Sequence, residues 1–165
     1  MKTKVLVVFF ILVISLSLSA ENSDTALMKG FRASLQNNQF DISIPFIFNS
    51  SVELAPSISI VYANEVGTDF GIGLSLRKYN LIGKVAPFYG IRCGVLSYKP
   101  KNQDSVNDFI AGLCTGAEYF FEKNLSLGVE LQLNGSFSDE FSYRFCNPDE
   151  FNINTASTVF VSVYW

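Results

Sequence analysis

The clearest pattern along the chain is a strict alternation of apolar and polar residues from Leu125 to Asn134. One side of an extended chain would carry the aliphatic residues Leu125, Leu127, Val129, Leu131 and Leu133. The other side would carry Ser126, Gly128, Glu130, Gln132 and Asn134. A period of two predicts a β-strand, because a helix cannot sort these residues onto two faces. About ten residues is also the length at which a tilted strand crosses a bilayer.

The same alternation recurs along the chain, with turn residues between the repeats. After residue 20 it predicts no helix and eight strands, at about Leu27–Leu35, Gln39–Phe48, Val52–Tyr62, Phe70–Arg77, Lys84–Tyr98, Asp108–Phe121, Leu125–Asn134 and Asn152–Trp165. Pro45 lies inside the second strand and predicts an edge or a bulge there, because proline cannot donate a ladder hydrogen bond.

The first twenty residues follow a different pattern. Lys2 and Lys4 precede the apolar run Val5–Ile14, and small residues then lead to Ala20. This layout predicts a secretory signal peptide over residues 1–20, cleaved after Ala20, and export through the Sec pathway. A retained membrane anchor is the alternative, but the apolar run is short for a full span and polar residues follow at once. Residues 21–165 are then one domain.

Alternation alone does not decide whether the apolar face points inward or outward. A soluble sandwich or lipocalin-like barrel would bury it, and a membrane barrel would expose it to lipid. The polar faces favour the membrane barrel, because they combine glycines, which leave room in a narrow lumen, with charges of both signs. We expect two stacked layers of lumen ion pairs, with scattered surface charges as the alternative. The layers are Arg77, Glu53 and Glu118 near one end, and Arg32, Arg92 and Glu130 near the middle.

Aromatic residues gather near the predicted strand ends. One set is Phe48, Tyr79, Tyr119, Phe121 and Trp165, and the other is Phe40, Tyr62, Phe70, Tyr98, Phe109 and Phe137. They predict two belts at the levels of the lipid headgroups. Turns at the first end are short, whereas Lys99–Asn107 and Ser138–Phe151 at the other end are long loops. The sequence therefore predicts an all-β, eight-stranded, antiparallel up-and-down transmembrane β-barrel.

Charge and composition exclude several classes of function. Removing residues 1–20 would change the formal charge from 12 − 15 = −3 to 10 − 15 = −5, which argues against a nucleic-acid partner. The chain has no histidine, and Cys93, Cys114 and Cys146 have no metal-ligand spacing, so we expect no metal and no cofactor. We interpret Cys93 and Cys114 as small apolar fillers and Cys146 as a loop thiol.

Two segments carry a resemblance to a known family. The run from Gly116 to Glu130 resembles the penultimate hairpin, and Asn152–Trp165 the last strand, of the small outer-membrane β-barrels that include OmpX, OmpW and the OmpA transmembrane domain. The resemblance implies residence in the bacterial outer membrane, among outer-membrane lipid. It also implies recognition by the barrel-assembly machinery through an aromatic C-terminus, here Trp165 with Val159, Val161 and Val163 on the same face.

Several functions remain open at this point. A structural or interaction protein would act through its outer loops on an unknown ligand, because an eight-stranded barrel has room only for its own side chains. The acidic pairs Asp139-Glu140 and Asp149-Glu150 would attract cations or a basic partner, or would simply be solvated. A narrow channel for small apolar or amphipathic solutes would use Phe88, Leu96, Ile110 and Phe120. An enzyme is not expected, because histidine is missing as a base. A lipocalin-like carrier would be soluble.

Overall fold

The structure is a computed structural model, and it describes residues 28–36, 39–48, 51–63, 67–101, 104–145 and 148–165. The predicted signal peptide with its cleavage site, and the thiol of Cys146, lie outside these residues. Among the described residues, no helix is long and apolar enough to span a membrane.

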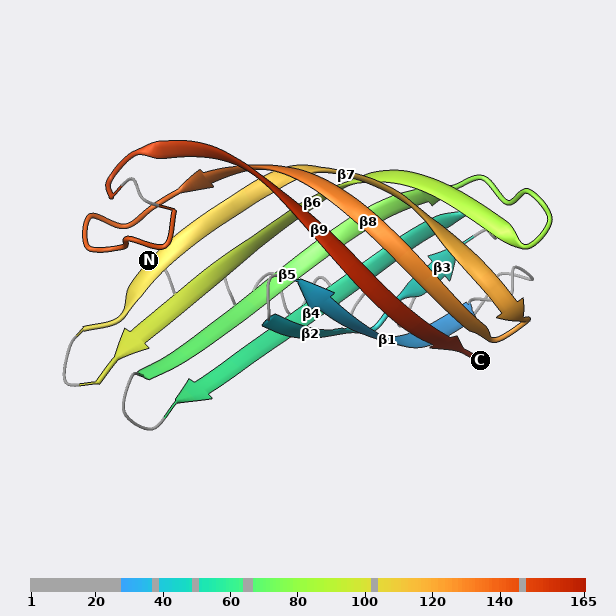
Figure 1. Cartoon of the computed structure of the whole chain (residues 1–165), viewed down its shortest axis with the longest axis horizontal. Helices are drawn as coiled ribbons and strands as arrows, with labels where there is room; N and C mark the ends of the chain where they lie inside the picture. Colours follow the sequence, from blue (N-terminus) through green and yellow to red (C-terminus); the bar gives the residue numbers. More distant parts are fainter. Residues whose placement is uncertain (1–27, 37–38, 49–50, 64–66, 102–103, 146–147) are drawn as a thin grey trace.

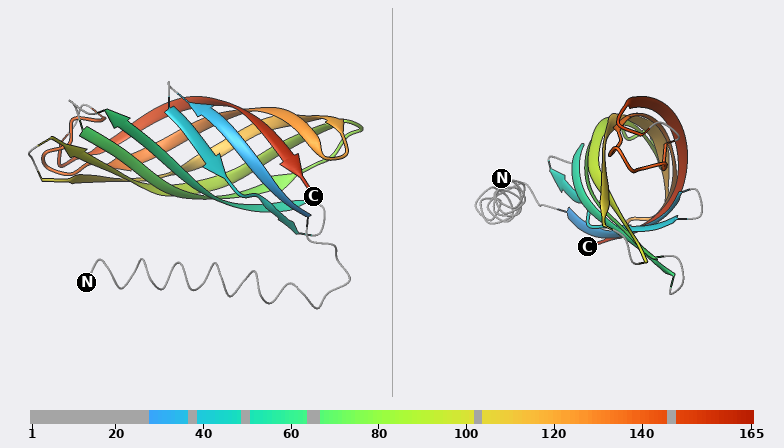
Figure 2. Two further views of the ribbon diagram at one scale, coloured as in Figure 1. Left: turned by 90° about the horizontal axis from the view of Figure 1, so that it is seen from below. Right: turned by 90° about the vertical axis from the view of Figure 1, so that its left-hand side faces the viewer.

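Nine β-segments follow one another along the chain and form one closed antiparallel sheet (Figure 1). They are β1 (Met28–Gln36), β2 (Gln39–Ser43), β3 (Phe46–Phe48), β4 (Val52–Ala63), β5 (Gly67–Tyr79), β6 (Val85–Pro100), β7 (Val106–Glu122), β8 (Leu125–Phe137) and β9 (Phe151–Tyr164). Pairing of β1 with β9 closes the sheet into a barrel, seen end-on in Figure 2. Since β2 and β3 are two halves of one predicted strand, the prediction of eight strands is confirmed.

The break between β2 and β3 falls at Ile44 and Pro45, where the sequence predicts an irregularity. The backbone stays paired through it, because Gly30 N donates to the Pro45 carbonyl (2.9 Å) and Ile44 N donates to the Pro56 carbonyl (3.0 Å). Gly30 has to be a glycine, since an added Cβ would lie 2.7 Å from Tyr164 Cδ1 and 3.0 Å from Pro45 Cγ. The proline is therefore accommodated inside the barrel without loss of closure.

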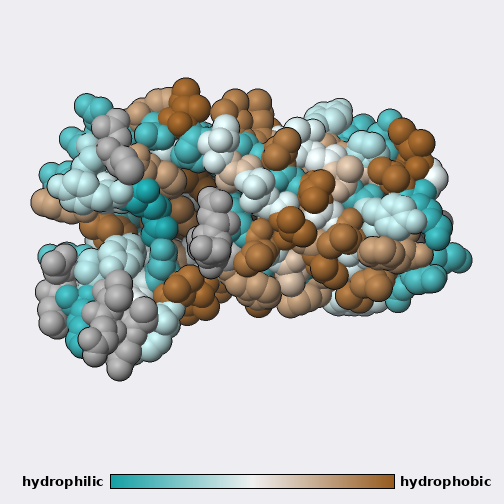
Figure 3. Space-filling view, viewed as in Figure 1, coloured by the Kyte–Doolittle hydropathy of each residue, from teal (hydrophilic) through white to brown (hydrophobic). Residues whose placement is uncertain are grey.

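The alternation sorts side chains with the apolar face outward. In β8, each aliphatic residue from Leu125 to Leu133 is exposed, and each residue between them, from Ser126 to Asn134, is buried. Apolar side chains cover much of the middle of the barrel wall (Figure 3). The soluble alternatives required the opposite arrangement and are wrong, because charged and hydroxyl side chains fill the interior.

The two ends of the barrel differ as the sequence predicts. The short connections 80–84 and 123–124 lie at the end where Trp165 pairs with Lys29. The opposite end carries residues 101 and 104–105 and the described part of the long loop, residues 138–145 and 148–150. In the end-on view, this long loop folds over the barrel opening (Figure 2). We call this opening the mouth.

Candidate functional site

Arg32 on β1 is the centre of a buried polar network in the lumen. Its two terminal nitrogens donate to the two carboxylate oxygens of Glu53 on β4, both at 2.7 Å. The same guanidinium lies 3.4 Å from Glu118 on β7, and donates to Ser162 (2.8 Å) and Tyr164 (2.9 Å) on β9. Only 1% of the Arg32 side chain is exposed, so a single buried cation ties together strands from around the whole barrel.

Arg77 on β5 extends this network toward β8. Its guanidinium lies 3.1 Å from Glu53 Oε1 and 2.6 Å from Glu130 Oε2. The hydroxyl of Tyr79, two residues along, lies 2.9 Å from Glu118 Oε2 and 3.1 Å from Glu53 Oε2, and its one hydrogen can be donated to either carboxylate. Each buried carboxylate therefore has a counter-charge, which is the condition under which charges persist away from water.

The prediction of lumen ion pairs is confirmed for Arg32, Glu53, Arg77, Glu118 and Glu130, but their division into two layers is wrong. Arg32 was expected in a layer with Glu130 and instead contacts Glu53 and Glu118. Strands in a closed barrel are tilted and staggered, so equal positions along two strands do not lie at equal height. Height in the lumen is therefore set by the stagger of the sheet.

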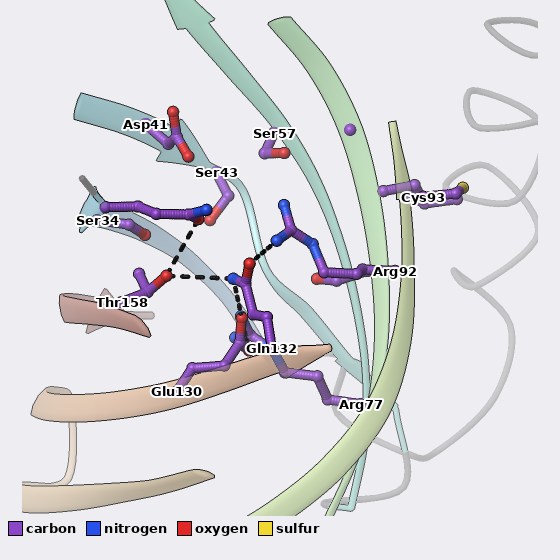
Figure 4. Close-up of a pocket in the computed structure, with 14 residues that line it drawn as sticks. Ser34, Asp41, Ser43, Ser57, Arg77, Arg92, Cys93, Glu130, Gln132 and Thr158 are labelled. Atoms are coloured by element: carbon purple, nitrogen blue, oxygen red, sulfur yellow. Dashed lines mark hydrogen bonds and ion pairs between the residues drawn. The ribbon is translucent and has the colours of Figure 1, made fainter. Parts of the chain in front are cut away.

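Arg92 on β6 lies apart from the ion pairs, and no carboxylate of the described residues is within ion-pairing distance of it. It donates to Oε1 of Gln132, whose Nε2 donates to Glu130 (2.7 Å) and Thr158 (3.1 Å) (Figure 4). A polar chamber of ≈ 50 Å³ lies beside these residues and is also lined by Asp41. A volume of this size holds a water molecule or two.

Aromatic side chains pack among the ionic side chains of the lumen. Tyr79, Phe88 and Phe160 form a buried cluster in which neighbouring ring centroids are 5.2 and 6.1 Å apart. The guanidinium of Arg77 lies 4.9 Å from the centre of the Phe88 ring, and that of Arg32 lies 4.5 Å from the centre of Phe160. These cation–π contacts join the aromatic cluster to the ionic network.

Asp108 at the start of β7 holds the long loop over the mouth. This carboxylate is buried, and it accepts hydrogen bonds from Ser142 Oγ (2.7 Å), Asp139 N (3.1 Å) and Arg144 Nε (3.2 Å). Arg144 also donates to Asp69 on β5 at 2.8 Å. Partial burial alone would lower the pKa of Arg144, but hydrogen bonds and opposite charge from Asp69 and Asp108 raise it above its ordinary value. Arg144 is therefore a permanent cation in this clamp.

This clamp is not among the features that the sequence predicts. A signal was present, because Asp108 lies on the inward-facing register of β7 with Ile110 and Cys114, where an acidic residue needs a partner. The partner could not be found from the sequence, because Arg144 lies in an irregular loop. Alternation with a period of two does not predict which way a side chain points in such a loop.

Two solved structures share this fold at low sequence identity. The N-terminal β-barrel domain of OprF from Pseudomonas aeruginosa aligns with a TM-score of 0.59 and 14% identity, covering 84% of this chain and 96% of that one. Neisserial surface protein A aligns with a TM-score of 0.56 and 14% identity, covering 84% and 94%. The chain has the fold of the small eight-stranded outer-membrane β-barrels. No protein-family model and no curated protein sequence matches it.

Most of the predicted belt aromatics lie on the outer face of this barrel. Those that do are Phe40, Phe48, Tyr62, Phe70, Phe109, Tyr119, Phe121, Phe137 and Trp165. The prediction is wrong for Tyr79 and Tyr98, which do not lie on the outer face. Tyr79 is buried in the ionic network, and Tyr98 pairs with Asp69 and faces the mouth. Both fall on the inward register of their strands, and closeness to a strand end does not decide which way a side chain points.

The residues of the predicted assembly signal also lie on the outer face. Val159, Val161 and Val163 of β9 are exposed, alternating with buried Phe160, Ser162 and Tyr164, and Trp165 follows with 71% of its surface exposed. Their role in assembly stays a prediction.

The close contact between Gly128 and Phe160 gives a direct test of how tightly the aromatic cluster is packed. A Cβ built on Gly128 would collide with the Phe160 ring, 2.7 Å from Cε1 and closer to two other ring carbons. We expect Gly128→Ala to destabilise the barrel by about 1–3 kcal/mol through overpacking. The measurement is urea unfolding in lipid vesicles. Gly128→Ala with Phe160→Leu should be less destabilised than the two single changes added together. Simple additivity would contradict this packing.

Proposed function

We propose that the protein is a barrel of the bacterial outer membrane with a closed, non-conducting lumen, and that it acts through its outer loops in a structural or interaction role. The observation that carries this proposal is the continuous network from Arg32 through Glu53 and Arg77 to Glu130. These side chains cross the lumen between strands β1, β4, β5 and β8 and are all less than a tenth exposed. A path for ions would have to break several buried charge pairs at once.

The surroundings of the barrel support the same proposal. Exposed aliphatic residues in the middle of the wall, such as Leu131 (64%), would be costly in water and are favourable in hydrocarbon. We propose that outer-membrane lipid covers them, that the assembly machinery recognises Trp165 with Val159, Val161 and Val163, and that residues 1–20 direct export through the Sec pathway.

The alternative of a narrow channel for small apolar or amphipathic solutes loses its support. Phe88 is 2% exposed and packs against Tyr79 and Phe160. Phe120 packs against Tyr164, with the two ring centroids 5.9 Å apart. These rings fill the lumen rather than line a path through it.

Planar bilayer recording tests the closed lumen. We expect the refolded chain from residue 21 to 165 to give no steady unit conductance, although boiled and unboiled samples should migrate differently on a gel and so demonstrate that the barrel is folded. A general porin inserted by the same procedure serves as the positive control. Steady pores of defined size from folded protein would overturn the proposal.

A further inference from the structure

The mouth contains a large pocket that is separate from the closed lumen below it. Its volume is ≈ 1050 Å³, about the upper limit for small-molecule sites. It lies between the long loop and the ends of β5, β6 and β7, and the hollow at the loop end of the molecule in Figure 3 shows it from outside. The lumen chambers, of ≈ 50 and ≈ 60 Å³, are far smaller.

The walls of this pocket combine aromatic rings with carboxylates. Tyr98, Phe141 and Tyr143 provide the rings, and Asp69 and Asp104 provide the acids. Phe141 and Tyr143 are 70% and 78% exposed, so both rings are accessible to a ligand from solvent. Ring faces and carboxylates both attract a positively charged group. The rings can also bury the apolar surface of a ligand.

The net charge of the mouth favours a cationic ligand over an anionic one. Asp69 with residues 99–108 and 138–150 contributes seven carboxylates and three basic side chains. One of the three, Arg144, is already held by Asp69 and Asp108. Of the two acids that line the pocket, Asp69 is paired with Arg144, and Asp104 has no ion pair within the described residues.

We propose that the mouth pocket binds an amphipathic cation, in which a positive charge lies next to an apolar or aromatic body. The charge lies near Asp104, and the apolar body lies against Tyr98, Phe141 and Tyr143. This inference rests on the proposed role of the outer loops and names the chemistry of their ligand.

Titration calorimetry on the folded barrel in phosphatidylcholine nanodiscs tests the proposal, because this lipid carries no net charge. The probe is N-acetyl-phenylalanyl-arginine amide, and we expect saturable binding that weakens as salt is added. N-acetyl-phenylalanyl-citrulline amide keeps the shape without the charge, and N-acetyl-glycyl-arginine amide keeps the charge without the ring. Each should bind about tenfold more weakly or worse.

Two exposed pocket residues allow substitution without disturbing the fold. Asp104→Asn and Tyr143→Ala should each weaken binding of the probe by about tenfold. Glu140→Gln is the matched control for Asp104→Asn, because Glu140 is an exposed acid of the long loop that does not line the pocket. Its binding should stay close to that of the unchanged protein.

Three results would overturn the inference: no saturable binding of the probe, equal binding of the citrulline analogue, or equal loss in Asp104→Asn and Glu140→Gln. The third would mean diffuse attraction to an acidic surface. None of them changes the bilayer recording, so a silent barrel without binding would refute this inference alone. A conducting barrel would refute the proposed function instead.

Discussion

Replacing Arg32 with methionine is expected to lower the free energy of unfolding by about 3–5 kcal/mol. The substitution keeps a long side chain but leaves Glu53 without its two 2.7 Å hydrogen bonds and Glu118 without its nearby cation. Both carboxylates are fully buried, so water cannot replace the lost partner. Urea unfolding in lipid vesicles measures the change, with the fluorescence of Trp165, the single tryptophan of the chain, as the signal.

Two further variants separate the network from a general effect of substitution. Arg32→Lys keeps the charge but not the planar fork that bonds both oxygens of Glu53, so its stability should be intermediate. Lys29→Met removes an exposed cation three residues earlier on the same strand and should change stability by no more than about 0.5 kcal/mol. Equal losses in Arg32→Met and Lys29→Met would show that the network does not stabilise the barrel.

Replacing Leu131 with arginine is expected to destabilise the barrel by about 2–4 kcal/mol in a bilayer. Leu131 is at the middle of β8 and is 64% exposed on the outer wall. An arginine there would lie in hydrocarbon at the bilayer midplane. The same change at an equally exposed site in water would alter stability by about 0.5 kcal/mol or less. The experiment therefore reports directly on what surrounds the wall.

Leu81 provides the matched control for this prediction. It is 62% exposed, but it lies in the turn 80–84 at the end of the barrel, where an arginine side chain can reach water. Leu81→Arg should leave the unfolding curve nearly unchanged. Equal effects at Leu81 and Leu131 would mean that lipid does not cover the middle of the wall.

The fold could be predicted from sequence because its signals are local. The alternation in Leu125–Asn134 fixes both the strand and its two faces, and turn residues separate one repeat from the next. Pro45 even marked the break between β2 and β3, since the missing N–H is a property of a single residue. The polar, glycine-containing face indicated a lumen with paired charges.

The partners within the lumen could not be predicted in the same way. Arg32 bonds Glu53, 21 residues away, and Ser162, 130 residues away, and these contacts depend on barrel closure and stagger. Nearness to a strand end predicts Tyr79 in a belt, although Tyr79 shares the face of Arg77 and therefore points into the lumen. The clamp of Arg144 on Asp69 and Asp108 involves a loop with no periodic pattern.

The strands, their inward and outward faces, and the charges of both signs on the inward face follow from the order of residues, because side-chain direction along a strand depends only on residue parity. Which charges meet, which aromatic rings pack among them, and where the long loop is held became visible only in the folded barrel. Those contacts join residues that are distant in sequence, and their geometry exists only once β1 and β9 have closed the barrel.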